Sequence, residues 1–190
     1  MDPVAMSRRA AERAVARRGA KKMASGVMPI VIENRAAGRF FSHLFGPLMG
    51  ASLQQKRSFL EGMLGKSIGS DKLDVTDDPL LPRGLGSRPC DNEGIGAKRM
   101  TIFEQGVLKN HYIDTYYGKK LGAAPTTGGM SNLSWKLGTK DRNGLIADVK
   151  DGVLITAFLG GNSNGTTGDF SVGFQGFAIR GGKLAEPVSE

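Results

Sequence analysis

The sequence has no long hydrophobic run and no pair of cysteines. No apolar stretch approaches the roughly 18 residues that a membrane-spanning helix needs, and the first residues lack the apolar core of a signal peptide. Cys90 is the only cysteine, so the chain cannot form an internal disulfide. We therefore expect a cytoplasmic protein that does not contact a membrane.

Recognisable catalytic signatures are also missing. The only two histidines, His43 and His111, are far apart, and neither lies in an H-E-x-x-H pattern or beside a cysteine pair. We expect both to be surface or packing residues, and Cys90 to be an incidental thiol. The glycine-rich stretch Gly160–Asp169 lacks the G-x-x-x-x-G-K-[ST] order of a phosphate-binding loop. The residues alone therefore indicate no catalytic site.

Glycine and local positive charge are the abundant features. The chain has 28 glycines among 190 residues, about twice the average share of ~7%, which favours short strands joined by tight turns. The net charge is +8, but residues 8–22 hold seven basic residues and one acid and therefore carry six of these charges. A basic helix is usually a solvated face, so nucleic-acid binding is the less favoured interpretation.

Hydrophobic periodicity predicts strands interspersed with helices in one domain. Helices are expected at 2–18, at 113–121, at 145–149 and twice within 34–65, where Gly46-Pro47 separates them. Strands are expected at 27–33, 72–76, 133–137, 152–159 and 170–179, and twice within 95–113 around a turn at Glu104-Gln105-Gly106. The block 169–188 should form a hairpin inside a sheet.

Four blocks of sequence together resemble the TldD/PmbA family. They are GPLMGASLQQKRSFLEGMLGK (46–66), DDPLLPRGLGSRPCDNEGI (77–95), GVLKNHYIDTYYGKKLG (106–122) and TTGDFSVGFQGFAIRGGKLAEPV (166–188). Members are known as modulators of DNA gyrase and are related to metallopeptidases. The resemblance implies an α+β fold, a curved and mainly antiparallel sheet with flanking helices. Residues 27–190 would be the C-terminal domain, residues 1–26 a basic connecting helix at its entrance, and the family's N-terminal domain would be absent from this chain.

The resemblance also indicates that a zinc site has been lost. TldD-type members carry H-E-x-x-x-H after a strand, with two histidines that hold zinc and a glutamate that activates water. The matching positions here are Asn34, Arg35 and Arg39. The terminal block, which supplies a cysteine ligand in TldD-type members, has no cysteine. We therefore expect no catalytic residue, no metal and no cofactor in this chain, with zinc only in a TldD-type partner.

The function implied is that of a non-catalytic subunit of the PmbA (TldE) kind. It would pair with a TldD-type peptidase, or with itself as a homodimer, in the proteolysis or maturation of unfolded or modified peptides. Candidate peptide-binding residues lie at the glycine-rich turn: Asn162, Ser163, Asn164, Thr166, Thr167 and Asp169. Two alternatives stay open, an active metallopeptidase with unrecognised ligands and a regulator that binds nucleic acid or gyrase.

Overall fold

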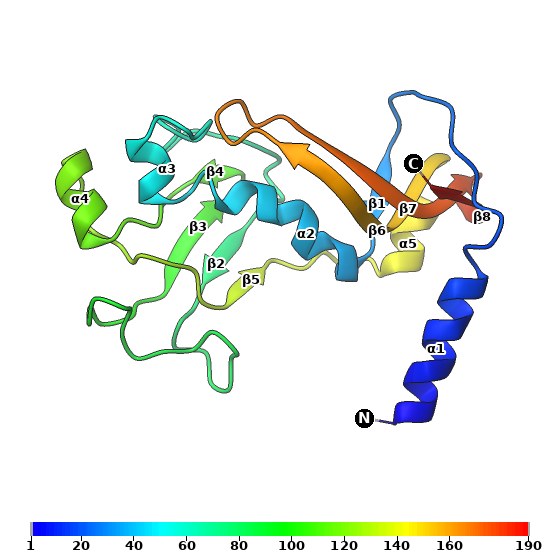
Figure 1. Cartoon of the computed structure of the whole chain (residues 1–190), viewed down its shortest axis with the longest axis horizontal. Helices are drawn as coiled ribbons and strands as arrows, with labels where there is room; N and C mark the ends of the chain where they lie inside the picture. The colour runs from blue at the N-terminus through cyan, green and yellow to red at the C-terminus, as the bar shows by residue number, and fades with distance from the viewer. Residues whose placement is uncertain (1, 190) are drawn as a thin grey trace. The chain divides into compact units, whose positions relative to one another are not determined.

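The computed structural model describes residues 2–189, which form two compact units. The first unit comprises residues 2–42, 139–163 and 170–189, and the second comprises residues 43–138 and 164–169. Figure 1 labels the helices and strands. Each unit contains a four-stranded, mainly antiparallel sheet with helices. The expected α+β class is confirmed.

Helix α1 (Pro3–Val15) opens the first unit, as the sequence predicts. The side chain of Asp2 accepts a hydrogen bond from the backbone nitrogen of Val4 at 2.9 Å, and Pro3 occupies the first helical position. The chain leaves the helix through turns that end at Gly19, whose φ is +74°. No residue of α1 is buried. The helix is therefore held by side-chain contacts at its surface and not by an apolar face.

The first sheet has the strand order β1-β6-β7-β8. Its strands are β1 (Ile30–Ile32), β6 (Asp151–Ser163), β7 (Phe170–Arg180) and β8 (Lys183–Ser189). β1 pairs in parallel with β6, and the other pairs are antiparallel. The predicted terminal hairpin is confirmed as β7 and β8, which are joined through Gly181 and Gly182, both with positive φ.

Two predicted boundaries in this sheet are wrong. β1 covers only Ile30–Ile32, because Pro29 lacks a backbone donor and the chain before it forms no ladder. β6 continues past Leu159 to Ser163, into the glycine-rich stretch that was expected to be a turn. Gly161 makes this possible, because a Cβ atom at that position would lie 2.3 Å from the carbonyl oxygen of Ser171 in β7.

Alternate residues of the first sheet form two apolar layers. Val31, Leu154 and Ile179 pack with Ile146 of the short helix α5 (Arg142–Ala147). The opposite face carries a second cluster made of Val153, Ile155, Ala178 and Val188. The sheet of the first unit is therefore covered by apolar contacts on both faces at its centre.

The second unit contains the sheet β4-β3-β2-β5, in which all pairs are antiparallel. Its strands are β2 (Val75–Asp77), β3 (Met100–Glu104), β4 (Val107–Leu108) and β5 (Leu133–Trp135). The turn between β3 and β4 is at the predicted place. Gln105 and Gly106 there have φ values of 49° and 76°, the two left-handed positions of a two-residue hairpin turn.

The helices of the central region differ partly from prediction. They are α2 (Asn34–Phe45), α3 (Gly50–Gln54) and α4 (Thr115–Leu121). The expected second helix was wrong beyond Gln54, because Lys56 has a φ of 58° and the following residues form turns up to Gly65. α4 ends at Gly122 in the left-handed conformation, as predicted. α5 begins at Arg142, three residues before the expected helical turn, because Asp141 caps it.

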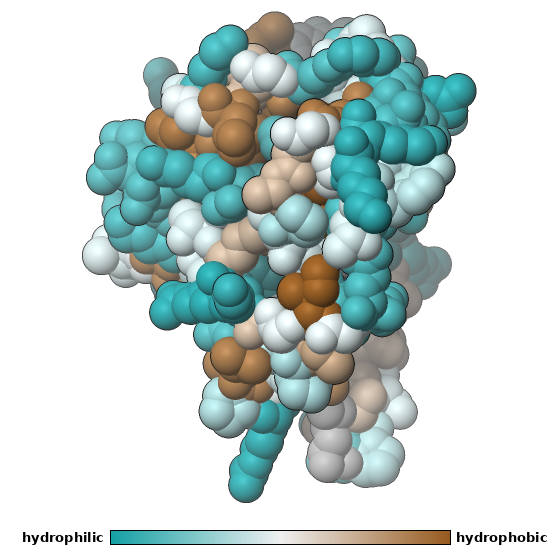
Figure 2. Space-filling model, turned by 90° about the vertical axis from the view of Figure 1, so that its left-hand side faces the viewer, coloured by the Kyte–Doolittle hydropathy of each residue, from teal (hydrophilic) through white to brown (hydrophobic). Residues whose placement is uncertain are grey.

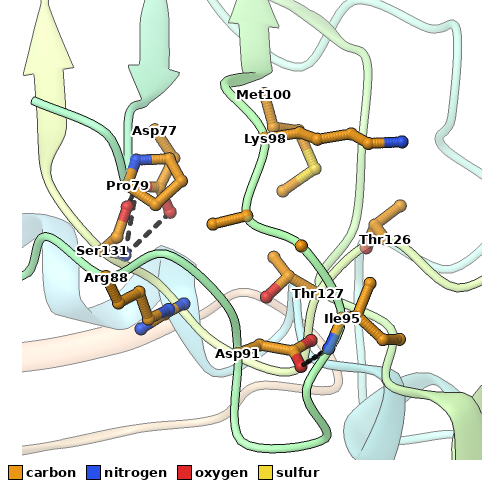
Figure 3. A pocket seen from close by; sticks show the side chains of 12 residues that line it. Asp77, Pro79, Arg88, Asp91, Ile95, Lys98, Met100, Thr126, Thr127 and Ser131 are labelled. Carbon is orange, nitrogen blue, oxygen red and sulfur yellow. Dashed lines mark hydrogen bonds between the residues drawn. The ribbon is translucent and has the colours of Figure 1, made fainter.

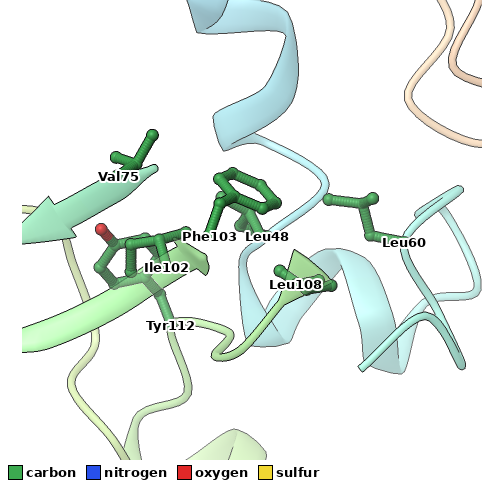
Figure 4. Close-up of a cluster of buried hydrophobic side chains, with 7 residues drawn as sticks. All are labelled: Leu48, Leu60, Val75, Ile102, Phe103, Leu108 and Tyr112. Carbon is green, nitrogen blue, oxygen red and sulfur yellow. The ribbon is translucent and has the colours of Figure 1, made fainter. Parts of the chain in front are cut away.

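The core of the second unit is a cluster of side chains drawn from residues 48 to 112 (Figure 4). Its fully buried members are Leu48, Leu60, Val75, Ile102, Phe103, Leu108 and Tyr112. Tyr112 brings a hydroxyl group into this apolar cluster, and that hydroxyl needs an acceptor.

The described residues include several large hydrophobic side chains that are exposed. Figure 2 shows one face of the molecule, on which brown hydrophobic patches are interrupted by teal hydrophilic side chains. The described residues with large exposed side chains include Leu80, Leu85 and Leu137. Single exposed apolar residues are ordinary on a protein surface. Pairing with a TldD-type peptidase or with a second copy therefore stays a prediction. No helix among residues 2–189 combines the length and the apolar character needed to cross a bilayer.

Candidate functional site

The junction of β1 and α2 carries the positions matched to the zinc motif. Glu33 continues the ladder of β1, because its backbone nitrogen donates to the carbonyl oxygen of Ile155 at 2.9 Å. α2 begins at the next residue, Asn34. Asn34, Arg35 and Arg39 are all exposed on α2. These three residues therefore begin the helix that follows β1, and with Glu33 they lie in the first unit; their match to the zinc motif stays a prediction.

Glu33 carries the one carboxylate of this junction, and two arginines bind it. Arg13 of α1 donates from both terminal nitrogens to the two carboxylate oxygens, at 3.0 and 2.5 Å. Nη1 of Arg142 lies 3.5 Å from Oε1 of the same carboxylate. The Glu33 side chain is only 9% exposed. The hydrogen bonds from Arg13 are the main cause that lowers the pKa of Glu33, and the positive charges of Arg142 and Arg35 add to the effect.

This donor set does not suit a zinc ion. Zinc takes neutral imidazole, thiolate or carboxylate ligands in a tetrahedral arrangement. Arg35 and Arg39 are permanently charged and have no lone pair to offer, and the carboxylate of Glu33 already binds two guanidinium groups. Within residues 2–189, no three histidine, cysteine, aspartate or glutamate side chains converge as a metal site would require. No chemical step through a metal follows from these residues.

Arg39 has a different contact. Its Nη2 donates to the carbonyl oxygen of Leu159 in β6 at 3.0 Å. β1 pairs with β6 only from Val153 to Ile155, so the named strands leave residues 157–163 of β6 paired on one side, by β7. Helix α2 already contacts this part of β6, because Arg39 takes the carbonyl oxygen of Leu159 and Phe40 stacks on Phe158 with ring centroids 6.1 Å apart. A peptide in extended conformation would add to the edge only by displacing the Arg39 contact or beyond it.

The structure separates the candidate peptide-binding residues into two groups. Asn162 and Ser163 lie in the last part of β6 and pair with Ser171 and Phe170. The other four candidates form the turn that belongs to the second unit: Asn164, Thr166, Thr167 and Asp169. All six candidate residues are exposed.

The polar groups of that turn are bonded mostly to one another. Oδ1 of Asn164 accepts from the nitrogen of Thr166 at 3.0 Å, and the hydroxyl of Thr167 donates to Asp169 at 2.7 Å. The carbonyl oxygen of Gly165 accepts from the nitrogen of Phe59 at 2.9 Å. These bonds fix the turn against the second unit. Peptide binding by the four turn residues stays a prediction.

A small polar cavity lies elsewhere in the second unit (Figure 3). Its volume of about 10 Å³ is enough for one water molecule. Asp77 and Ser131 close one side of it, and Arg88 and Asp91 close another. Nε of Arg88 and Oδ2 of Asp91 are buried and have no hydrogen-bond partner among the protein atoms described. The cavity is too small for a substrate.

Two other candidates from the sequence, His111 and Cys90, belong to the second unit. His111 is 8% exposed, and burial lowers its pKa. Cys90 is exposed as a free thiol. The pairing of Glu33 with Arg13 and Arg142 could not be found from the sequence, because these residues are separated along the chain and no local pattern links them. The only sequence signal was an acid that ends a strand in a chain rich in arginine.

Comparison with known proteins gives consistent results. The model of the PmbA/TldA metallopeptidase C-terminal domain matches residues 25–190. A curated relative from Haemophilus influenzae, the metalloprotease PmbA homolog, is 33% identical over 193 residues, which cover 99% of this chain and 42% of that protein. The chain therefore spans less than half the length of this relative.

Solved structures show the same fold. The crystal structure of a candidate modulator of DNA gyrase from Bacteroides thetaiotaomicron is 46% identical and superposes with a TM-score of 0.94, over 96% of this chain and 42% of that one. The structure of TldE from Thermococcus kodakarensis is 23% identical, with a TM-score of 0.82, over 96% of this chain and 45% of that one. At that identity the likeness concerns the fold.

Proposed function

Because the chain belongs to the PmbA/TldA metallopeptidase C-terminal domain family, we propose that it is part of a non-catalytic subunit of the PmbA (TldE) kind. It would assist a TldD-type zinc peptidase in the proteolysis or maturation of unfolded or modified peptides in the cytoplasm. The observation that carries the proposal is that the carboxylate of Glu33 forms ion pairs with arginines. Two arginines bind the one acid of the junction, and two further arginines stand at motif positions, where a metal site needs electron-pair donors.

The contribution of this chain would be a surface for the peptide and for the partner subunit. The edge of β6 beyond Ile155 has backbone groups on the side away from β7. Main-chain hydrogen bonds to such an edge depend little on the side chains of the peptide. That property suits a subunit that handles unfolded peptides of varied sequence. Asn162 and Ser163, which lie on this strand, are the candidate residues that best fit this role.

Two alternative functions remain as competing proposals. An active metallopeptidase would need ligands that the described residues do not bring together. A binder of nucleic acid or gyrase would draw on the basic segment 8–22. Part of that charge is already neutralised, because Arg13 is paired with Glu33. A DNA affinity that falls steeply with salt would favour this second alternative.

Co-purification from the native host tests the proposal. The protein would be isolated under mild conditions, and the recovered proteins would be identified by mass spectrometry. We expect a protein that carries H-E-x-x-x-H to be recovered in stoichiometric amount, and peptide cleavage to require it. Cleavage of peptides by this protein alone, with metal in its own chain, would overturn the proposal.

A further inference from the structure

A hollow of about 260 Å³ lies between α1 and the first sheet, entirely within the first unit. α1 and the turn after it contribute Arg13, Ala16 and Arg17, and Arg142 comes from α5. The sheet contributes Leu154, Thr156, Phe177 and Leu184. The volume is slightly below the range of about 300–1,000 Å³ for small-ligand pockets, and it suits one or two amino-acid residues.

The floor of this hollow is apolar and partly open. Leu154 is buried, Phe177 is half-buried, and Leu184 is 43% exposed although it is a leucine on a strand. Contact with an apolar group would remove the remaining exposed surface of Leu184 from water. This burial is favourable by about 25 cal/mol for each Å². The floor therefore suits an aliphatic or aromatic side chain.

The rim of the hollow has more positive than negative charge. Three arginines face two acids, Glu33 and Glu12. Arg13 and Glu33 neutralise each other through two hydrogen bonds. Arg17 differs, because the acceptors that the structure gives it are neutral: Oε1 of Gln175 at 3.1 Å and Oγ1 of Thr156 at 3.4 Å.

Arg142 completes the charged side. Its side chain is 52% exposed, and it reaches Glu33 only at 3.5 Å, on an oxygen that Arg13 already binds. Each guanidinium has five N–H donors, so donors remain for another acceptor. A half-buried cation beside an apolar surface is stabilised by a matching anion. The hollow thus combines an apolar floor with a cationic rim.

We propose that this hollow binds the C-terminal end of a peptide, with the carboxylate on Arg17 and Arg142 and an apolar last side chain over Phe177 and Leu184. The geometry of the hollow suits any carboxylate that is attached to an apolar group. The choice of a peptide as the ligand rests on the proposed function. A terminal carboxylate lies close to the last side chain, so both can fit within the small hollow.

Calorimetric titration of the purified protein tests this assignment. The probes are the peptide Ala-Ala-Ala-Leu with a free carboxylate, the same peptide with a C-terminal amide, and octanoate. We expect the free acid to bind about tenfold or more tightly than the amide, since one charge-assisted contact is worth about that factor. Arg17→Met and Arg142→Met should each weaken binding of the free acid by a similar factor. Ala16→Phe should block binding by filling the hollow, without any change of charge.

The control is Arg180→Met, which removes an arginine of similar exposure, 54%, outside the hollow. This variant should bind the free acid as the unmodified protein does, and circular dichroism checks the folding of each variant. Equal affinity for acid and amide, or binding that survives all three substitutions in the hollow, would overturn the assignment. If octanoate binds and the free-acid peptide does not, the assignment to a peptide C-terminus is overturned as well. Co-purification results do not affect these outcomes, because no partner is present in the titration.

Discussion

The hydroxyl of Tyr112 donates a hydrogen bond of 2.8 Å to Oδ2 of Asp77, between a core side chain and a carboxylate 35 positions earlier in the sequence. Tyr112 is 1% exposed and Asp77 is 2% exposed. The same carboxylate accepts from the backbone nitrogen and the hydroxyl of Ser131. Burial and the negative charge of Asp77 raise the pKa of Tyr112 well above its ordinary value, so the phenol stays protonated and remains a donor.

Removal of this hydroxyl should destabilise the second unit. We expect Tyr112→Phe to lower the free energy of unfolding by about 1–3 kcal/mol, because a buried carboxylate loses one of its donors. Tyr116→Phe is the matched control, since Tyr116 is 55% exposed, and it should change stability by less than about 0.5 kcal/mol. Urea unfolding of both variants gives the comparison. Equal stability of the two would contradict the role assigned to the Tyr112 hydroxyl.

Stability should depend on pH through His111. Burial lowers the pKa of this histidine below its ordinary value of 6.5, so the unfolded chain takes up a proton before the folded protein does. The free energy of unfolding should therefore fall as the pH drops below about 6.5, until the folded histidine also becomes protonated. Urea midpoints between pH 7.5 and 5 test this. His111→Gln should remove that part of the slope and His43→Gln should retain it; the reverse pattern would contradict the argument.

The hairpin turn between β3 and β4 should tolerate no side chain at Gly106. A Cβ atom there would lie 2.4 Å from the carbonyl oxygen of Gly69, and the backbone φ is +76°. Gly122 has a similar φ of +65° but nothing within 4 Å of such an atom. Gly122→Ala should lower the free energy of unfolding by about 1 kcal/mol through backbone strain alone. Gly106→Ala should lower it by clearly more, because the close contact adds to the strain. Similar losses for the two variants would show that the close approach to Gly69 is unimportant.

The ion pair of Arg13 and Glu33 should hold α1 on the first unit. Arg13→Met leaves the buried carboxylate of Glu33 with Arg142 as its only cationic partner. We expect the free energy of unfolding to fall by about 1–3 kcal/mol. Amide hydrogen exchange in α1 should accelerate. Arg9→Met, one helical turn earlier and exposed, should leave exchange unchanged. Because the pKa of Glu33 is lowered from 4.5, this stabilisation is present at neutral pH and is lost as the pH falls below about 4.5. Unaltered exchange in Arg13→Met would refute the anchoring role.

Local chemistry made part of the fold predictable from the sequence. Asp2 and Pro3 marked the start of α1, and Gln105-Gly106 marked the turn of a hairpin, since each acts on its immediate neighbours. The end of α3 was not predictable, because the positive φ of Lys56 has no local cause in the sequence. The extent of β6 was missed because Gly161 serves close packing against β7 and not a loop.

The candidate site was predictable only in part. The resemblance to the family pointed to Asn34, Arg35 and Arg39, which lie at the start of the helix after β1, and their match to the zinc motif stays a prediction. The partners of Glu33 were not predictable, because they come from α1 and α5, which only the folded chain brings together. Long-range ion pairs leave no periodic pattern in a sequence.

Zinc content tests the central claim, that the motif positions of this chain do not form a metal centre. Elemental analysis of the purified protein after zinc titration and dialysis should give much less than one zinc per chain. The triple variant Asn34→His, Arg35→Glu and Arg39→His provides the comparison, since it restores the residue types of the motif. Stoichiometric zinc in the unmodified protein, lost when His43 is replaced by Gln, would contradict the account and indicate an active metallopeptidase.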